Sequence, residues 1–320
     1  MKFKTRFYNL NHLQGSDEPM NRALKRILFT ALILAVLCYI MLDDLLQGNW
    51  KSVDDSWNNL STFWSESLWP PEWSMLEARK YPECTSSFGF FCSKAYIGML
   101  ETLKMAFVST IIGFFIAIIL SPFAAKNLTS AWIYVPMRII LAATRSLPSI
   151  IWAILFVVIV GLGPLAGVLA MTFYTVGYLG KLQYEEMEGI QNSPLEAARA
   201  MGLSHPEIVT NVVIPESSNN LLSQLLFMFE YNVRHGTVLG LVGAGGIGYY
   251  LDFYMGWQMY QHVMAFLVVI LVVVIIIDLI SMYIRSFVTE DGDVKRPSWS
   301  TIFLSPKQAK EIHHGKSKKD

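Results

Sequence analysis

The sequence has few charged residues for its length. Asp, Glu, Lys and Arg make up 16% of the 320 residues, whereas 53% are hydrophobic. A typical soluble domain is about 25% charged, so this composition excludes an ordinary soluble domain. The 25 acidic and 25 basic residues cancel, and no excess of positive charge indicates a nucleic-acid partner. The composition predicts a polytopic membrane protein that does not bind nucleic acid.

The sequence also lacks the residue groupings that carry catalysis or bind a cofactor. A Gly-Lys-Ser tripeptide starts at Gly315, but Lys310 stands where a phosphate-binding loop needs its first glycine. The glycine-rich run 240–248 follows an apolar segment rather than a strand, which excludes a dinucleotide-binding fingerprint. No nucleophile–base pair, metal-ligand cluster or catalytic pair of carboxylates is found in the sequence. We therefore expect no catalytic residue, metal or cofactor in this chain.

Cysteine is scarce, with 3 residues in the chain. Cys38 lies in a hydrophobic run, whereas Cys84 and Cys92 lie in a more polar segment without a neighbouring His or second Cys pair, which excludes a zinc site. If that segment faces an oxidising compartment, Cys84 and Cys92 are expected to form a disulfide, and the alternative is two free thiols.

Long apolar runs are what the sequence has in abundance. A membrane-spanning helix needs about 20 mostly apolar residues, and we predict about six such helices. Their ranges are 27–46, 105–125, 146–160, 164–180, 220–241 and 263–284. The stretch 131–145 before the third carries Arg138 and Arg145, so we expect it to lie along the membrane surface before the chain turns inward at Pro148. The predicted fold class is all-α.

The distribution of Lys and Arg predicts the orientation. Basic residues are concentrated in the tails 1–26 and 286–320, and cytoplasmic flanks of membrane proteins hold the excess of Lys and Arg. Both termini are therefore expected to be cytoplasmic, with 27–46 as the first span and 47–97 as an external loop. That loop is rich in Trp, which is typical of segments at the headgroup level of a bilayer.

One polar stretch between the oily segments predicts a helix–turn–helix on the cytoplasmic side. Ser193 is suited to cap a short helix, Pro194 to stand at its first position, and Gly202 to end it in a left-handed conformation. Ser204 is expected to cap a second helix, with Pro206 early within it. Such a rigid knob is suited to docking into a cleft of a partner protein.

The residues of this stretch carry a specific resemblance. The run Glu196-Ala197-Ala198, then Gly202 and, after nine intervening residues, Val212-Val213-Ile214-Pro215, is similar to the EAA loop of permeases in ATP-binding-cassette (ABC) importers. Val and Ile stand here where that family usually has Ile and Leu. The resemblance implies that Glu196, Ala197, Ala198, Gly202 and Pro215 belong to a coupling helix seated in a groove of an ATPase subunit.

A narrower resemblance covers roughly residues 100–285. The segments "LETLKMAFVSTIIGFFIAIILSPFAAKNL", "RSLPSIIWAILFVVIVGLGPLAGVLA", "TVGYLGKLQYEEMEGI" and "NVRHGTVLGLVGAGGIG" together resemble the phosphonate importer permeases, a family that includes phosphite and hypophosphite members. This resemblance implies a type I ABC importer permease in the inner membrane, with a core domain 98–285 and a cytoplasmic coupling loop 185–215. Phosphite or phosphate remains open as the cargo.

The same resemblance implies the partners. They are a second permease subunit expected to be identical, two cytoplasmic ATPase subunits that bind ATP and Mg, and an outer substrate-binding protein. Two rival classes remain to be separated from this one. A stand-alone channel or secondary transporter has no need of a docking knob, and a membrane-embedded enzyme needs the catalytic groups that are missing.

Polar residues inside the fifth predicted span are candidates for the substrate pathway. An intramembrane charge costs about 3 kcal/mol on insertion scales and usually faces a bundle interior or a water-filled path. Arg234 is the main candidate, since a guanidinium binds an oxyanion bidentately, and Glu230, Asn232 and Thr237 are its neighbours. The alternative is that Glu230 and Arg234 form a structural i,i+4 ion pair.

Two further features have open interpretations. Asp278 lies deep in the last apolar run and needs a partner on a neighbouring span, which the sequence does not identify. The glycines between Gly243 and Gly248 suit either an anion-binding nest of N–H groups or close packing of helices.

Overall fold

The computed structural model describes residues 17–79 and 88–288, and no strand is found among them beyond an isolated bridge between Ala78 and Ser93. The chain divides into two compact units, residues 1–66 and 67–320. The all-α prediction is confirmed for the described residues. The terminal tails and the 80–87 segment that holds Cys84 lie outside them.

The first unit contains two helices, α1 (Asp17–Leu45) and α2 (Lys51–Phe63), joined by a turn. The segment Leu24–Leu45 is apolar enough to cross a membrane, and none of its spanning window is buried within this chain. At the end of α1, Trp50 stacks on Tyr39 with ring centroids 5.3 Å apart and donates its indole N–H to Asp43 Oδ1 at 2.6 Å. These contacts hold the turn that separates the two helices.

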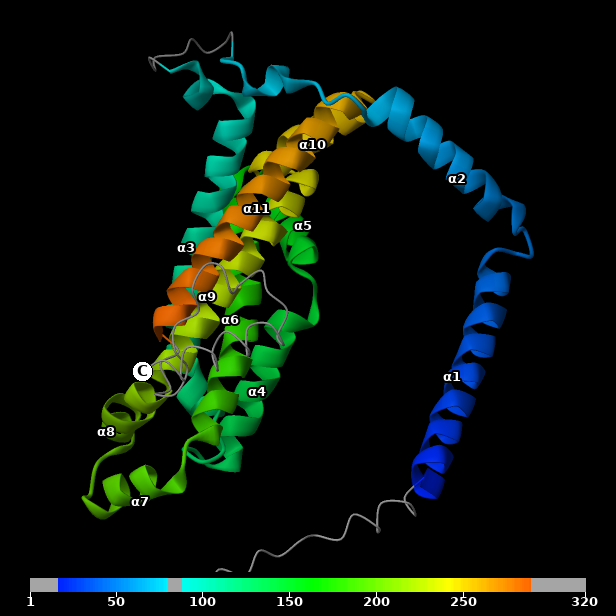
Figure 1. Cartoon of the computed structure of the whole chain (residues 1–320). Coiled ribbons are helices and arrows are strands. Elements are labelled where there is room, and N and C mark those ends of the chain that lie inside the picture. The colour runs from blue at the N-terminus through cyan, green and yellow to red at the C-terminus, as the bar shows by residue number, and fades with distance from the viewer. Residues whose placement is uncertain (1–16, 80–87, 289–320) are drawn as a thin grey trace, which may run out of the picture. The chain divides into compact units, whose positions relative to one another are not determined.

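The second unit is a bundle of four long helices that lie side by side (Figure 1). They are α3 (Lys94–Ala124), α6 (Pro164–Gly189), α9 (Ile214–Leu239) and α11 (Tyr260–Val288). Small residues let α3 and α6 approach closely, as is typical of membrane bundles. A Cβ on Gly113 of α3 would lie 2.5 Å from Thr175 Cγ2 of α6.

Two shorter helices complete the core beside α6. Helices α4 (Ala131–Ser146) and α5 (Ser149–Val160) meet at Leu147 and Pro148 with a bend of 85°. Proline at 148 excludes a continuous helix there, because it restricts the residue before it to extended backbone. The predicted turn at Pro148 is confirmed, while the position of α4 relative to a membrane surface stays a prediction.

Within the described residues, four helices are long and apolar enough to span a membrane, or up to five if the bent pair α4–α5 is one span. The sequence interpretation counted α9 as well. That helix has 26 residues, ample length for a span, but a run of Ser and Asn at 217–220 and the charges of Glu230 and Arg234 make it less apolar than the others. Two other helices are longer than the predicted spans: α3 begins at Lys94 rather than at residue 105, and α6 ends at Gly189 rather than at residue 180.

The core unit also begins earlier than the predicted boundary at residue 98. Met75, in the 3-10 turn Trp73–Leu76, is 1% exposed and packs in the same hydrophobic cluster as Phe266. The Glu72 N–H donates to the Gln261 carbonyl at 3.1 Å. The last part of the predicted external loop is therefore built into the bundle.

The glycine-rich loop after α9 is a close-packed turn. Gly243, Gly245 and Gly246 have φ angles of 80°, 81° and 75°, which favour glycine. A Cβ on Gly245 would lie 2.9 Å from the Pro164 backbone and 3.0 Å from Glu101 Oε1. The loop leads into α10 (Ile247–Gly256), whose first N–H bonds Thr102 Oγ1 at 2.9 Å. The nearby carboxylate opposes an anion nest, so close packing is the better interpretation.

Candidate coupling loop and intramembrane charge cluster

Two short helices project from one end of the bundle, at the end opposite to α10 (Figure 1). Helix α7 (Asn192–Ala200) follows α6 after two residues. Helix α8 (His205–Ile208) is followed by a π-helical turn, Val209–Val213, that continues into α9. The predicted helix–turn–helix is present. Its first helix begins at Asn192 with Gln191 as N-cap, so the predicted cap at Ser193 and first position at Pro194 were wrong by two residues.

The bend between α7 and α8 has the predicted geometry. Gly202 has a φ of 77°, and no atom lies within 4 Å of the position of a Cβ there. The left-handed backbone, rather than crowding, is therefore the reason for glycine at this position.

Helix α8 has a complete capping box that the sequence interpretation overlooked. Glu207 Oε2 accepts from the Ser204 N–H at 2.7 Å and from the Ser204 hydroxyl at 2.6 Å. The hydroxyl bond, followed by the backbone bond, lowers the pKa of the Glu207 carboxyl below its usual value. The spacing Ser-x-x-Glu was the signal that could have predicted it.

The two faces of α7 differ in burial. Leu195 and Ala198 are 2% and 0% exposed and pack in a cluster with Met187 at the end of α6. Glu196, Ala197 and Met201 are exposed on the other face. Pro215 stands near the start of α9 and is exposed. An anchored helix with an open face is what a docking element requires.

Four charged residues between α9 and α11 form a cluster with equal numbers of acids and bases. Arg234 Nη2 lies 2.6 Å from Asp278 Oδ1 and 3.9 Å from Glu230 Oε2. Glu230, whose side chain is 8% exposed, is bonded by Arg285. The predicted i,i+4 pair is thus the weaker contact, since each member has a closer partner on α11.

Arg234 keeps hydrogen-bonding capacity beyond this pair. Its side chain is 45% exposed, and Asp278 engages only Nη2. The remaining guanidinium donors have no hydrogen-bond acceptor among the described residues. Of the predicted pathway residues, Arg234 is therefore the one whose side chain both carries charge and is open to a ligand.

The structure does not bring Asn232 and Thr237 to that open surface. Asn232 is 1% exposed, and its amide donates to Thr110 Oγ1 at 2.8 Å and Thr175 Oγ1 at 2.9 Å. Thr237 is 8% exposed and donates to the Arg234 carbonyl at 2.7 Å. Asn232 joins α9 to α3 and α6, and its amide hydrogens are already used inside the bundle. Its role in the substrate pathway stays a prediction.

A column of stacked rings on α6 and α9 was missed by the sequence interpretation. Tyr231 stacks on His235 with centroids 4.0 Å apart and on Tyr174 at 5.6 Å, and the Tyr231 hydroxyl donates to Tyr174 Oη at 3.0 Å. His235 Nδ1 lies 2.9 Å from Ser149 Oγ of α5. The i,i+4 spacing of Tyr231 and His235 was the available signal.

Of the cysteines, Cys38 is a free thiol and Cys92 is disulfide-bonded. Cys84 lies outside the described residues, so its pairing with Cys92 stays a prediction. No group of three or more His, Cys, Asp or Glu side chains suited to a metal ion is present among the residues described.

A helical membrane bundle with charged residues between its spans and an exposed helix–turn–helix at one end defines a transport permease rather than an enzyme. The chain belongs to the family described as the binding-protein-dependent transport system inner membrane component, whose sequence profile matches residues 109–289. It is thus an inner-membrane, multi-pass subunit without catalytic residues of its own.

Individual relatives agree with this assignment. The phosphite transport system permease protein PtxC of Stutzerimonas stutzeri is 36% identical over 188 residues, 58% of this chain and 68% of the relative. The phosphate-import permease protein PhnE of Mycolicibacterium smegmatis is 37% identical over 152 residues, 47% of this chain and 29% of the relative. In the inward-facing MetNI methionine ABC transporter, one chain superposes with a TM-score of 0.54 at 28% identity, covering 61% of this chain and 95% of that one.

Proposed function

We propose that this permease imports a phosphorus oxyanion, phosphonate or its relatives phosphite and phosphate, driven by a partner ATPase. The similarity to the phosphite and phosphate permeases supports the cargo class. An oxyanion needs charge-assisted donors along its path, and the open guanidinium of Arg234 is such a donor.

The observation that carries the proposed mechanism is the exposed face of α7 beside the Gly202 bend. Glu196, Ala197 and Gly202 lie on the exposed part of the element that docks on the ATPase, Ala198 packs that element against the end of α6, and Pro215 connects it to α9. Two permease subunits, two ATPase subunits that hold ATP and Mg, and an outer binding protein complete the transporter. ATPase closure then switches which side of the membrane the cavity between the permeases faces.

This assembly requires α7 to lie on the cytoplasmic side, and we propose the same side for both termini. Helix α7 and the last turn of α11 with Arg285 lie toward the same end of the bundle (Figure 1). That arrangement agrees with the concentration of Lys and Arg in the tails.

Two measurements test the proposal. The chain is co-purified in detergent with its cognate ATPase, and the assembled transporter is placed in vesicles with its binding protein. We expect stable co-purification and ATP-dependent uptake of labelled phosphonate, phosphite or phosphate. Uptake without an ATPase would instead indicate a channel or secondary transporter.

A further inference from the structure

We propose that Glu188 and Arg199 are positioning residues that link the coupling helix α7 to α3 and α4. The proposal rests on the proposed coupling function of α7. By chain continuity alone, α7 is connected to α6 before it and to α9 after it. Helices α3 and α4 have no such connection, so any force that reaches them from α7 must pass through side-chain contacts.

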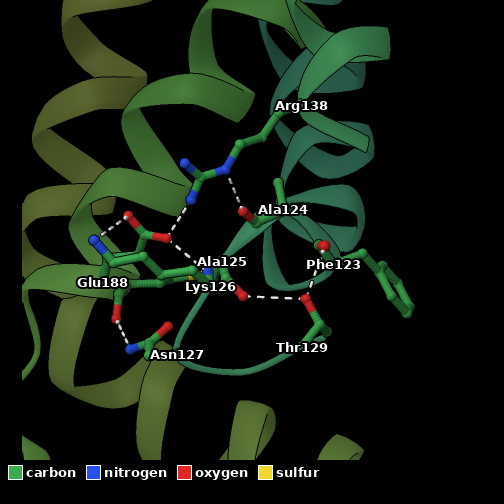
Figure 2. A network of polar contacts seen from close by, with 9 residues as sticks. Phe123, Ala124, Ala125, Lys126, Asn127, Thr129, Arg138 and Glu188 are labelled. Carbon is green, nitrogen blue, oxygen red and sulfur yellow. Dashed lines mark hydrogen bonds and ion pairs between the residues drawn. The ribbon is translucent and has the colours of Figure 1, made fainter. Parts of the chain in front are cut away.

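Glu188, near the end of α6, is the centre of these contacts (Figure 2). Its Oε1 accepts from the Lys126 backbone N–H at 2.6 Å and from the Arg138 guanidinium, and its Oε2 lies 3.9 Å from Lys126 Nζ. The side chain is only 13% exposed. One carboxylate thus joins α6 to the turn after α3 and to α4.

Arg138 is held in place by a backbone carbonyl and two aromatic rings as well as by Glu188. Its Nε donates to the Ala124 carbonyl at the end of α3, at 2.8 Å. Its guanidinium lies over the rings of Tyr184 and Tyr134, at 4.5 and 5.0 Å from their centroids. A planar group that bonds two different acceptors and stacks on aromatic rings is specific to arginine, and these contacts fix the angle between α4 and the ends of α3 and α6.

Arg199 brings the coupling helix into the same network. Its Nη2 donates to the Asn127 carbonyl at 2.6 Å, and the Asn127 side-chain amide donates to the Met187 carbonyl at 2.9 Å. The turn 125–129 after α3 is therefore held between α7 on one side and the end of α6 on the other. We call this set, Lys126, Asn127, Arg138, Glu188 and Arg199, the junction.

The chemistry of the junction suits the transmission of movement. Charge-assisted hydrogen bonds are stronger and more directional than apolar contacts, which allow helices to slide. Coupling between distant sites is carried by contiguous packed and hydrogen-bonded elements. When the ATPases move α7, the Arg199 bond carries the turn after α3 with it, and Glu188 and Arg138 pass that displacement to α4.

The test measures the ratio of oxyanion uptake to ATP hydrolysis in vesicles that contain the whole transporter. Glu188→Gln removes the negative charge, and Arg199→Gln removes the donor to Asn127. Coupling free energies typically correspond to factors of roughly 5 or more, so we expect each change to lower the ratio at least about fivefold. For Glu188→Gln, which lies outside the docking helix, co-purification with the ATPase and basal hydrolysis are expected to stay near those of the unchanged chain.

Matched controls lie on the same helices. Glu185, one turn before Glu188, forms only an exposed i,i+4 pair with Lys181 at 3.6 Å, so Glu185→Gln is expected to leave the ratio unchanged. Arg199→Lys keeps a donor at that position and is expected to restore most of the coupling lost in Arg199→Gln. Arg199 is exposed, so its variants remain informative even where Glu188→Gln prevents folding.

A second readout is independent of the cargo. Spin labels on Ser130→Cys and Ala200→Cys, in a chain whose free Cys38 is replaced, report the distance between the α3–α4 turn and α7. We expect a narrow distance distribution that broadens in Arg199→Gln. An unchanged uptake-to-hydrolysis ratio in both Gln variants overturns the proposed role of the junction, whatever the distance distribution between the spin labels. Failure of the unchanged chain to bind an ATPase would instead refute the proposed function.

Discussion

Arg234 on α9 and Asp278 on α11 form an ion pair, with Nη2 and Oδ1 2.6 Å apart. This pair provides the partner for Asp278 that the sequence left open. It also changes how a pathway role of Arg234 is tested, because Asp278 rather than Glu230 is the acid left unpaired when the arginine is removed.

We predict that Arg234→Gln abolishes most uptake and that Asp278→Asn has a smaller effect. Losing a hydrogen bond between charged groups destabilises a protein by about 1.5–3 kcal/mol. Each of the two single changes is expected to carry this penalty. The double change Arg234→Gln with Asp278→Asn removes that penalty, so its thermal stability in detergent should return toward that of the unchanged chain. Uptake should not return, because the donor to the oxyanion is missing. Near-normal uptake by the double variant would show that Arg234 has a structural role only.

The second prediction concerns the neighbouring pair of Glu230 and Arg285. Glu230 is 8% exposed on its side chain, so Glu230→Gln is expected to destabilise the bundle by about 2–3 kcal/mol. Adding Arg285→Gln should recover part of this loss, whereas adding Arg234→Gln should not. Thermal unfolding of the purified variants distinguishes them, and equal recovery by both second changes would contradict the observed pairing.

The third prediction uses the left-handed backbone of the coupling loop. Gly202→Val places a β-branched residue at a φ of 77°, which costs roughly 1–2 kcal/mol of backbone strain. We expect α7 and α8 to reorient and substrate-stimulated ATP hydrolysis to be lost, while the bundle still folds. Gly189→Val is the control, since its Cβ also meets no atom within 4 Å and its φ is not positive. Equal activity of the two variants would contradict this role of Gly202.

The fourth prediction concerns pH and the capping box of α8. The hydroxyl bond and the backbone bond from Ser204 lower the folded-state pKa of Glu207 below its usual value of 4.5. A lowered pKa means that the stabilisation is present above about pH 4.5 and is lost as the pH falls through the folded-state value. Hydrogen exchange of the α8 amides, corrected for the intrinsic rate, should show this loss. In Glu207→Ala, the α8 amides should exchange faster at every pH. Corrected exchange rates of the unchanged chain that do not rise as the pH falls would contradict the prediction.

The fifth prediction concerns the segment that holds Cys84 and Cys92. Cys92 is disulfide-bonded, and Cys84 is its predicted partner. A closed loop of this size is expected to contribute roughly 2–3 kcal/mol of local stabilisation in the chain-entropy model. Mass spectrometry of unreduced, proteolysed protein should find the two cysteines in one linked peptide. Recovery of both as alkylated thiols would reject the pairing.

Local sequence was sufficient to predict the two helices of the coupling loop, the bend at Gly202 and the start of α8, but it placed the start of α7 two residues too late. Gly202 has the left-handed φ of 77°, and Ser204 and Pro206 start α8 as expected. Apolar runs placed α1, α3, α6 and α11 because hydrocarbon excludes unsatisfied backbone groups and so requires continuous helices. These features depend on residues that are close in the chain, and conformational preferences act over that range.

Only the tertiary structure could identify the partners of the polar residues in the spans. Asn232 donates to Thr110, 122 positions away in the chain, and Arg234 finds Asp278, 44 positions away. Sequence spacing on one helix suggested Glu230 instead, because local periodicity reveals only pairs within one helix, three or four residues apart. The Glu188 carboxylate, bonded to Lys126 and Arg138, had no sequence signal at all. Helices that pack side by side bring together residues of unrelated position, so these contacts are determined by how the bundle packs rather than by the pattern of any one segment.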